Sequence, residues 1–272
     1  MLDLKRIDAY MDKVSKSEKR TYKPKKSRLK TGLDLGTAYI VLVVVDEDNN
    51  PVACEKRAAQ VLKDGVVVDY IGALTIVKEL KAKIEKRIGE ELCECAIAMP
   101  AGTESSAKTH QYIAEGAGFE VTAVLDEPSA ANAIYQIENG VIVDIGGGTT
   151  GLAVVKDGEV TEIYDEPTGG THLSLVLAGN LHISFDEANQ VKMDYSKHKE
   201  FMPIVRPVIE KMASIVNRYV KPGQVDTIYL CGGTCCFTGI ETVFEKMTGI
   251  KTIKPADPFL VTPAGIAINC KL

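Results

Sequence analysis

An internal repeat constrains the fold of this chain more than any other feature of the sequence. Residues 31–37 and 143–149 are each an apolar stretch that ends in an aspartate and a glycine turn, and a second apolar stretch follows each turn. Two further glycine turns match at residues 97–103 and 228–234, and Asp-Glu-Pro and Ala-Asp-Pro each open an Ala-rich segment, from residues 126 and 256. These matches occur in one order at nearly constant spacing, which predicts two lobes of similar architecture.

Apolar strand patterns and helical patterns alternate along both halves of the repeat. This alternation predicts a mixed sheet flanked by helices in each lobe, and therefore an α/β fold. The 272 residues suffice for two such lobes, which we place at residues 31–138 and 139–272. The greater length of the second lobe predicts a helix-rich insertion at about residues 168–221. Corresponding loops of the two lobes would face one another across a cleft, where ligand sites are common.

The first 30 residues differ from the rest of the chain in charge. They hold eleven Lys and Arg residues and four acidic residues, whereas the whole chain has a net charge of −5. The remaining chain is therefore acidic, which disfavours nucleic-acid binding because that binding depends on neutralising phosphates. Apolar residues near helical spacing predict an amphipathic helix over the first 15 residues, followed by a Lys-rich linker. The alternatives are a solvated tail, or a helix that docks onto a protein partner or an anionic surface.

From this sequence we expect neither a transmembrane segment nor an export signal. The longest apolar run, residues 39–45, is too short to cross a bilayer, and the N-terminus lacks the apolar core of a signal peptide. We therefore expect a cytoplasmic protein whose seven cysteines are reduced thiols. A zinc site at Cys93, Cys95, Cys235 and Cys236 is disfavoured, because neither pair has the usual two-residue spacer.

The two aspartate-containing glycine turns have the chemistry of a magnesium–phosphate site. Glycines allow phosphate oxygens to approach backbone N–H groups closely. Asp34 and Asp144, brought together by the duplication, could orient one Mg²⁺ through its water ligands, and Thr37 and Thr149 would add hydroxyl donors. Taken alone, the first turn is better explained as a simple tight turn. Its pairing with the second turn is what favours phosphate binding.

Other phosphate-binding motifs do not fit. Residues 146–151 satisfy the Gly-x-Gly-x-x-Gly dinucleotide pattern, but that pattern needs a helix to begin at the turn, and residues 152–155 continue as a strand pattern. The Gly-x-x-x-x-Gly-Lys-Ser/Thr loop does not occur. A third glycine turn, residues 231–234, has no carboxylate at its tip, so we expect it to bind a sugar or a base. The alternative is a simple turn from a strand to a helix.

Five segments resemble the phosphate, connecting and adenosine motifs of the actin-like ATPase superfamily, in the same order. They are Gly-Leu-Asp-Leu-Gly-Thr at 32–37, Asp-Glu-Pro-Ser-Ala-Ala at 126–131, Val-Asp-Ile-Gly-Gly-Gly-Thr at 143–149, Leu-Cys-Gly-Gly-Thr at 230–234 and Pro-Ala-Gly-Ile-Ala at 263–267. The resemblance covers about residues 31–270. It implies a duplicated actin-like (ribonuclease H-like) ATPase fold, with two lobes around a nucleotide cleft.

Parts of the chain resemble particular branches of this superfamily. Residues 97–133 are similar to DnaK-type chaperone ATPase domains, and residues from 167 onward are similar to the bacterial cell-division and pilus-assembly homologues. The runs Asp-Ile-Gly-Gly-Gly-Thr-Thr-Gly at 144–151 and Glu-Pro-Thr-Gly-Gly-Thr-His at 166–172 resemble a family of ethanolamine utilization proteins. That resemblance implies a protein client, an enzyme or shell component of a bacterial microcompartment.

The superfamily resemblance also implies roles for individual residues, with ATP and Mg²⁺ as the ligands. Asp34 and Asp144 would be the magnesium and catalytic carboxylates, and Glu127 would help to place the attacking water. The phosphates would contact Gly36, Thr37, Gly146, Gly147, Gly148 and Thr149; Gly232, Gly233 and Thr234 would border the adenosine; and Gly169 and Gly170 would approach the nucleotide from the insertion.

Two departures from the DnaK-type pattern bear on function. Gly151 stands where that pattern has an aspartate, and because only seven residues follow Gly265 in this sequence, we expect no peptide-binding domain of the DnaK type. We therefore expect nucleotide binding with slow hydrolysis or none. The leading hypothesis is a nucleotide-gated switch or chaperone-like factor. The alternatives are a nucleotide-binding scaffold or filament-forming protein, which Gly151 favours, and a small-molecule kinase, for which residues 51–92 are too short to form a large acceptor pocket.

Overall fold

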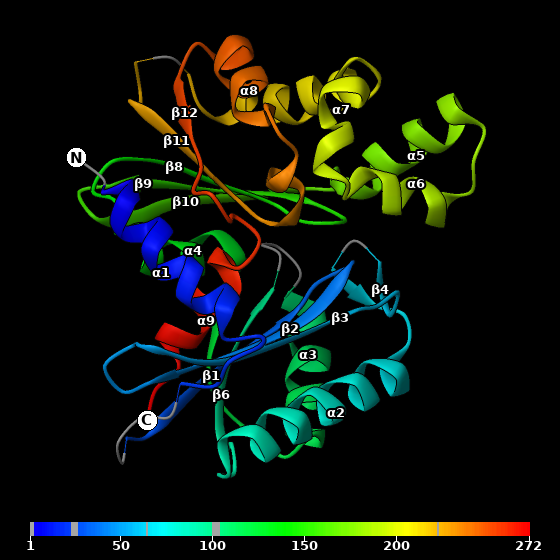
Figure 1. Cartoon of the computed structure of the whole chain (residues 1–272). Helices are drawn as coiled ribbons and strands as arrows, with labels where there is room; N and C mark the ends of the chain where they lie inside the picture. Colours follow the sequence, from blue (N-terminus) through cyan, green and yellow to red (C-terminus); the bar gives the residue numbers. More distant parts are fainter. Residues whose placement is uncertain (1–2, 23–26, 64, 100–103, 222) are drawn as a thin grey trace. The chain divides into compact units, whose positions relative to one another are not determined.

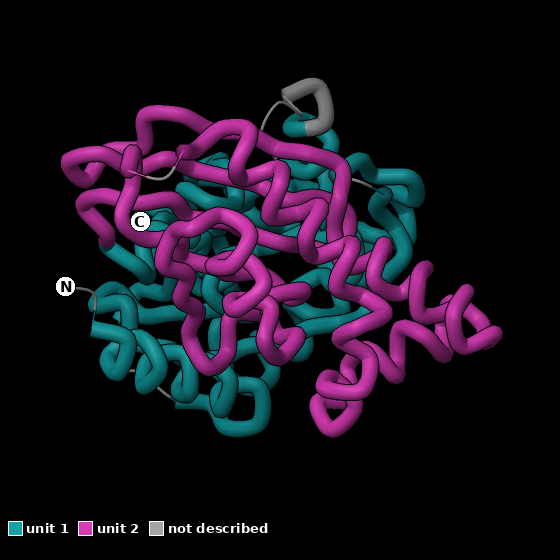
Figure 2. Tube along the Cα trace, turned by 90° about the horizontal axis from the view of Figure 1, so that it is seen from above, with its two compact units in different colours: residues 1–136, 260–272 teal, residues 137–259 magenta. Residues whose placement is uncertain are grey.

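The computed structural model describes residues 3–22, 27–63, 65–99, 104–221 and 223–272 (Figure 1). The glycine of the predicted turn at residues 97–103 lies outside these ranges. The chain forms two compact units: unit 1 comprises residues 1–136 and 260–272, and unit 2 comprises residues 137–259 (Figure 2).

Unit 1 is built on a five-stranded mixed sheet of order β3-β2-β1-β6-β7. β1, β2 and β3 are antiparallel neighbours, while β6 and β7 run parallel to β1. The strands are β1 (Leu29–Leu35), β2 (Tyr39–Asp46), β3 (Pro51–Ala58), β6 (Glu94–Met99) and β7 (Glu120–Asp126), and a separate two-stranded sheet pairs β4 (Leu62–Lys63) with β5 (Val66–Val67).

Helices cover both faces of this sheet. Figure 1 shows α2 (Tyr70–Ile88) and α3 (Glu104–Gly116) on one face, and α4 (Glu127–Tyr135) and α9 (Val261–Asn269) on the other. Side chains alternate along β1, so Leu33 and Leu35 join the core under α2 and α3, whereas Asp34 points to the opposite face. The fold therefore presents the Asp34 carboxylate on the face that α9 covers.

The N-terminal segment forms helix α1 (Leu4–Lys16), which packs against β3. Its apolar face, made of Ile7, Met11 and Val14, is buried. The first strand begins at Leu29, so the last two residues of the expected tail belong to the sheet. The segment that precedes the first repeat is thus part of the packed structure of unit 1.

Unit 2 repeats the sheet of unit 1 strand for strand. Its order is β10-β9-β8-β11-β12, with antiparallel pairing from β8 through β10 and parallel pairing from β8 through β12. The strands are β8 (Gly140–Ile145), β9 (Thr150–Lys156), β10 (Glu159–Glu166), β11 (Thr227–Cys231) and β12 (Lys251–Ile253). The repeated architecture predicted from the sequence is therefore confirmed at the level of strand order and direction.

The helices of unit 2 gather around one apolar core together with the sheet. In chain order they are α5 (Gly170–Leu181), α6 (Phe185–Lys192), the 3₁₀ turn η1 (Tyr195–Lys197), α7 (His198–Tyr219), the 3₁₀ turn η2 (Gly233–Cys236) and α8 (Ile240–Thr248). The first four of these fall within the predicted helix-rich insertion. β9 continues as a strand directly after the glycine turn, as the sequence predicts, so the turn does not open a helix as the dinucleotide motif requires.

The boundaries of the two compact units differ from those of the expected lobes, 31–138 and 139–272. Residues 260–272, which include α9, belong to unit 1. The reason is close backbone packing: a Cβ at Gly265 would collide with the Ala130 carbonyl oxygen of α4, so only glycine permits this approach. Ile266 and Cys270 complete a small core with Ala130 and the alanines of β6.

Candidate functional site

The second aspartate-containing glycine turn, residues 144–149, connects β8 to β9 in unit 2. We call it the phosphate-type turn. Asp144 is the penultimate residue of β8 and is 4% exposed, while Thr149, at the far end of the turn, is 7% exposed. The Gly146 N–H donates a hydrogen bond of 3.1 Å to the Thr149 carbonyl oxygen. Gly146 therefore closes the turn with its own amide, and Gly147 and Gly148 form the tip.

The turn before α5 packs directly on this tip. The Gly170 N–H donates to the Gly146 oxygen at 2.9 Å, and the Thr171 N–H donates to the Gly147 oxygen at 2.8 Å. A Cβ at Gly169 would lie 2.6 Å from the Gly147 oxygen, closer than real Cβ contacts. The structure thus brings Gly169 and Gly170 to the phosphate-type turn, and glycine is required for the approach.

The predicted adenosine turn, residues 231–234, packs against the phosphate-type turn and completes a cluster of three glycine turns. The Thr234 hydroxyl donates a hydrogen bond of 2.7 Å to the Gly146 oxygen. Gly232 has a positive φ of 90°, and a Cβ there would collide with an Asp144 carboxylate oxygen. Gly233 is exposed. Unit 2 therefore assembles, within one cluster, every candidate residue that it contains.

The corresponding turn of unit 1 connects β1 to β2 and has the same construction. Asp34 is the penultimate residue of β1 and is half-buried. The Gly36 N–H donates to the Tyr39 carbonyl oxygen at 3.0 Å, which matches the bond from Gly146 to Thr149. Thr37 lies at the bend of the turn. The duplication thus extends from strand order to the hydrogen bonding of the two turns.

Glu127 is the first residue of α4, next to the carboxyl end of β7. Asp126 caps this helix, because its carboxylate accepts the Ser129 N–H at 2.8 Å. Pro128 is buried at the second helical position, where a missing N–H is tolerated. The Asp-Glu-Pro segment therefore starts α4 and fixes the backbone of Glu127.

Lys192, which belongs to no recognisable sequence motif, contacts the first turn of α5 beside the Gly169–Gly170 turn. Its ammonium group donates to the Gly170 carbonyl oxygen at 3.1 Å and to the Ser174 hydroxyl at 2.8 Å. Burial lowers the pKa of Lys192 to about 8. Local sequence does not predict this contact, because it forms only where the end of α6 packs against the start of α5.

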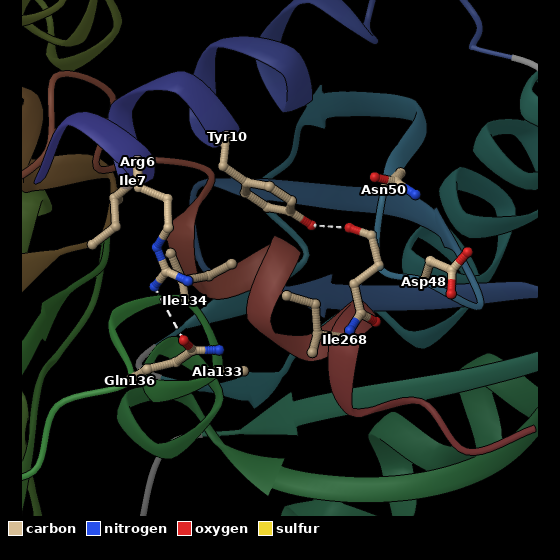
Figure 3. Close-up of a pocket in the computed structure, with 10 residues that line it drawn as sticks. Arg6, Ile7, Tyr10, Asp48, Asn50, Ala133, Ile134, Gln136 and Ile268 are labelled. Carbon is tan, nitrogen blue, oxygen red and sulfur yellow. Dashed lines mark hydrogen bonds between the residues drawn. The ribbon is translucent and has the colours of Figure 1, made fainter. Parts of the chain in front are cut away.

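A separate cavity of ≈ 280 Å³ lies in unit 1 beneath α1 (Figure 3). In its lining, the Tyr10 hydroxyl donates to the Asn49 oxygen at 2.8 Å and the Arg6 guanidinium donates to the Gln136 side chain at 3.1 Å. None of the candidate nucleotide residues lines this cavity. The hydrogen bonds instead show how α1 is attached to the β2–β3 turn and to the end of α4.

Metal-ligand groupings and membrane-spanning helices were sought across the described ranges. In that part of the chain, no set of three His, Cys, Asp or Glu residues is arranged to hold a metal ion by itself. Among the same residues, no helix is both long and apolar enough to span a membrane. All seven cysteines lie within the described ranges, and none of them forms a disulfide bond.

Known proteins share both the sequence and the fold of this chain. The ethanolamine utilization protein EutJ of Escherichia coli K12 is 42% identical over 89% of this chain and 86% of its own length. The chain belongs to the EutJ family. The crystal structure of the EutJ protein from Carboxydothermus hydrogenoformans is 46% identical, covers 97% of this chain and 98% of its own, and superposes with a TM-score of 0.90.

More distant similarities place this EutJ-family chain in the actin-like ATPase superfamily. Residues 112–267 match the family described as type IV pilus assembly protein PilM. The crystal structure of MreB5 from Spiroplasma citri bound to AMPPNP covers 89% of this chain and 95% of its own, with a TM-score of 0.70 and 20% identity. That likeness concerns the fold alone. The predicted fold class, a duplicated α/β actin-like ATPase fold, is confirmed by these similarities.

Proposed function

We propose that this EutJ-family chain binds ATP with Mg²⁺ through the glycine turns of both units. The observation that carries the proposal is the shared construction of the β1–β2 and β8–β9 turns, each with an aspartate as the penultimate residue of its strand. The residues suit the ligand: glycines have no side chain that would hold phosphate oxygens away from the backbone, and a buried carboxylate favours a cation. In this proposal Asp34, Gly36 and Thr37 contribute from unit 1.

Each residue of the cluster would have a defined task. Asp34 and Asp144 would hold the magnesium ion through water molecules, and the ion would neutralise charge on the phosphates. The phosphates would meet the tip formed by Gly147 and Gly148, while Gly232, Gly233 and Thr234 would border the adenosine. Glu127 would orient a water molecule for attack on the terminal phosphate.

We expect hydrolysis to be slow. Gly151 pairs with Asp144 across the β8–β9 ladder, at the position where DnaK-type proteins are expected to carry a carboxylate. A glycine has no side-chain carboxylate that could hold a water molecule or the metal ion there. Positioning and charge stabilisation account for most catalysis of phosphoryl transfer, so one missing carboxylate reduces the rate more than the affinity.

The biological role we propose is a nucleotide-gated switch or chaperone-like factor in ethanolamine utilization. Membership of the EutJ family supports the pathway. The client would be an enzyme or shell protein of the microcompartment, and the protein would act in the cytoplasm. Exchange or hydrolysis of the nucleotide would change the state that the client recognises.

Calorimetry of Mg·ATP binding to the wild type and to Asp144→Asn tests the proposal, with phosphate release measured on the same samples. The matched control is Asp186→Asn, an exposed carboxylate in the first turn of α6. We expect the wild type and the control to bind equally and Asp144→Asn to bind at least tenfold more weakly. Equal binding by all three proteins, or none by the wild type at millimolar ATP, would contradict the proposal.

A nucleotide-binding scaffold or filament is the second candidate, and Gly151 is the observation that favours it. Such a protein would bind Mg·ATP with negligible release of phosphate over hours. Electron microscopy and sedimentation with and without Mg·ATP would then reveal nucleotide-dependent polymers. A measurable turnover without polymers would instead support the switch.

A further inference from the structure

Lys192 closes a set of hydrogen bonds that joins three helices of unit 2. Its ammonium group, at the end of α6, binds the Gly170 carbonyl oxygen and the Ser174 hydroxyl of α5. The Ser174 hydroxyl also lies 3.1 Å from the Asn189 side-chain oxygen. The Lys192 carbonyl oxygen accepts a bond of 2.9 Å from Nε2 of His198, the first residue of α7.

Gly170 connects this set to the phosphate-type turn. Its N–H group points to the Gly146 oxygen, while its carbonyl oxygen points to the Lys192 ammonium. The next amide, that of Thr171, binds the Gly147 oxygen. The first turn of α5 is therefore held between Lys192 on one side and the Gly146–Gly147 backbone on the other.

The arrangement is one that stability alone would not favour. Lys192 is partly buried, with its ammonium group against a carbonyl and a hydroxyl, and it takes part in none of the ion pairs formed by the described residues. Burying an ammonium group without a carboxylate is unfavourable, which agrees with the lowered pKa of Lys192. The titratable neighbour from α7, His198, binds the Lys192 backbone and not the amine. An apolar residue would suit the site better unless the amine has a role.

We propose that Lys192 is a positioning residue for the nucleotide: its amine holds the start of α5 against the phosphate-type turn and thereby fixes the turn in the shape that binds phosphate. This inference rests on the proposed function. Lys192 would act through Gly170, without touching the nucleotide itself. It would also link the α5–α6 part of the insertion to the nucleotide turn.

The test compares Lys192→Met with the wild type and with Lys199→Met, which removes an exposed lysine from α7. Methionine nearly matches lysine in length but donates no hydrogen bond. We expect Lys192→Met to bind Mg·ATP about tenfold more weakly, equivalent to about 1.4 kcal/mol. Without nucleotide, its Gly170 and Thr171 amides should exchange with solvent faster, while its melting temperature at pH 7 stays equal or rises. Lys199→Met should match the wild type in all three measurements.

The outcomes separate this inference from the proposed function. If the wild type binds Mg·ATP and Lys192→Met binds equally well, or shows unchanged amide exchange, the inference fails and the proposed function stands. A wild type that binds no nucleotide overturns both. Weaker binding together with a clearly lower melting temperature would indicate a general structural role and would also overturn the inference. Should Lys192→Met not fold, Lys192→Arg is measured in its place: an affinity within threefold of wild type would support positioning by a cation, and a loss equal to that of Asp144→Asn would contradict it.

Discussion

The Ser17 carbonyl oxygen, just after α1, accepts a hydrogen bond of 2.6 Å from the guanidinium of Arg87, near the end of α2. The same guanidinium binds the Cys54 carbonyl oxygen and the Thr21 hydroxyl. It also forms an ion pair of 2.6 Å with Glu55, whose side chain is only 7% exposed. One arginine therefore fastens the N-terminal segment, β3 and α2 to one another.

Replacing Arg87 by methionine should destabilise unit 1 by about 3 kcal/mol. The substitution leaves the buried Glu55 carboxylate without its main partner, and removing one member of a buried ion pair is strongly destabilising. Lys83 also binds Glu55, but its side chain is 63% exposed, so we expect Lys83→Met to lower stability by less than about 1 kcal/mol. Urea unfolding followed by circular dichroism measures both. Equal midpoints for the two variants would contradict this account of the network.

Truncating Met11 tests whether α1 is an integral part of unit 1. Met11 is fully buried, so Met11→Ala should lower the free energy of unfolding by about 2–5 kcal/mol. Lys13→Ala, on the exposed face of the same helix, should change it by less than about 0.5 kcal/mol. A solvated tail would give no difference between the two variants in urea unfolding.

Much of the fold follows from the sequence, because a repeat of motifs requires a repeat of strands. The aspartate-containing turns, the repetition of a mixed sheet in two parts of the chain and the continuation of β9 as a strand all follow from sequence patterns. The position of α9 does not follow from local sequence patterns. Residues 263–267 match the superfamily pattern, but their packing in unit 1 depends on a tertiary contact, the close approach of Gly265 to Ala130.

Individual contacts at the candidate site were harder to predict. Gly169 and Gly170 were expected near the nucleotide from the family resemblance, and the structure places them on the phosphate-type turn. Lys192 gave no signal, because a lysine near a helix end is ordinarily solvated. Only the packing of α6 beside α5 buries its amine, and this packing cannot be inferred from local sequence.

Gly169→Ala should disrupt the phosphate-type turn. The new Cβ would lie 2.6 Å from the Gly147 oxygen and 2.6 Å from the Gly148 carbonyl carbon, so the start of α5 or the turn must shift. We expect Mg·ATP binding to weaken at least tenfold. The matched control is Gly179→Ala in α5, where the Cβ meets nothing within 4 Å. There, alanine should raise stability by up to about 1 kcal/mol, because glycine is unfavourable within a helix. Unchanged affinity in Gly169→Ala would show that the turn does not bind the nucleotide.

His198 should make the stability of unit 2 depend on pH below neutrality. Its Nδ1 accepts the Thr238 N–H at 2.9 Å, so this nitrogen carries no proton, and its Nε2 donates to the Lys192 oxygen. Burial lowers the pKa of His198, and Lys254 acts in the same direction, whereas the hydrogen bond to the Lys192 carbonyl oxygen and the charge of Asp194 oppose this shift. Protonation of Nδ1 would break the bond from Thr238.

The sign of the effect follows from proton uptake. An unfolded histidine gains its proton near pH 6.5, whereas the folded His198 gains it only at lower pH, so the unfolded state binds more protons in between. Stability should therefore be fully present above pH 6.5 and be lost as the pH falls towards 5, by at most about 1.4 kcal/mol per pH unit. His198→Asn keeps an acceptor for Thr238 but cannot be protonated. Urea unfolding at half-unit steps from pH 7.5 to 5 should show a smaller loss of stability for His198→Asn than for the wild type, and parallel curves would assign the pH dependence to other groups.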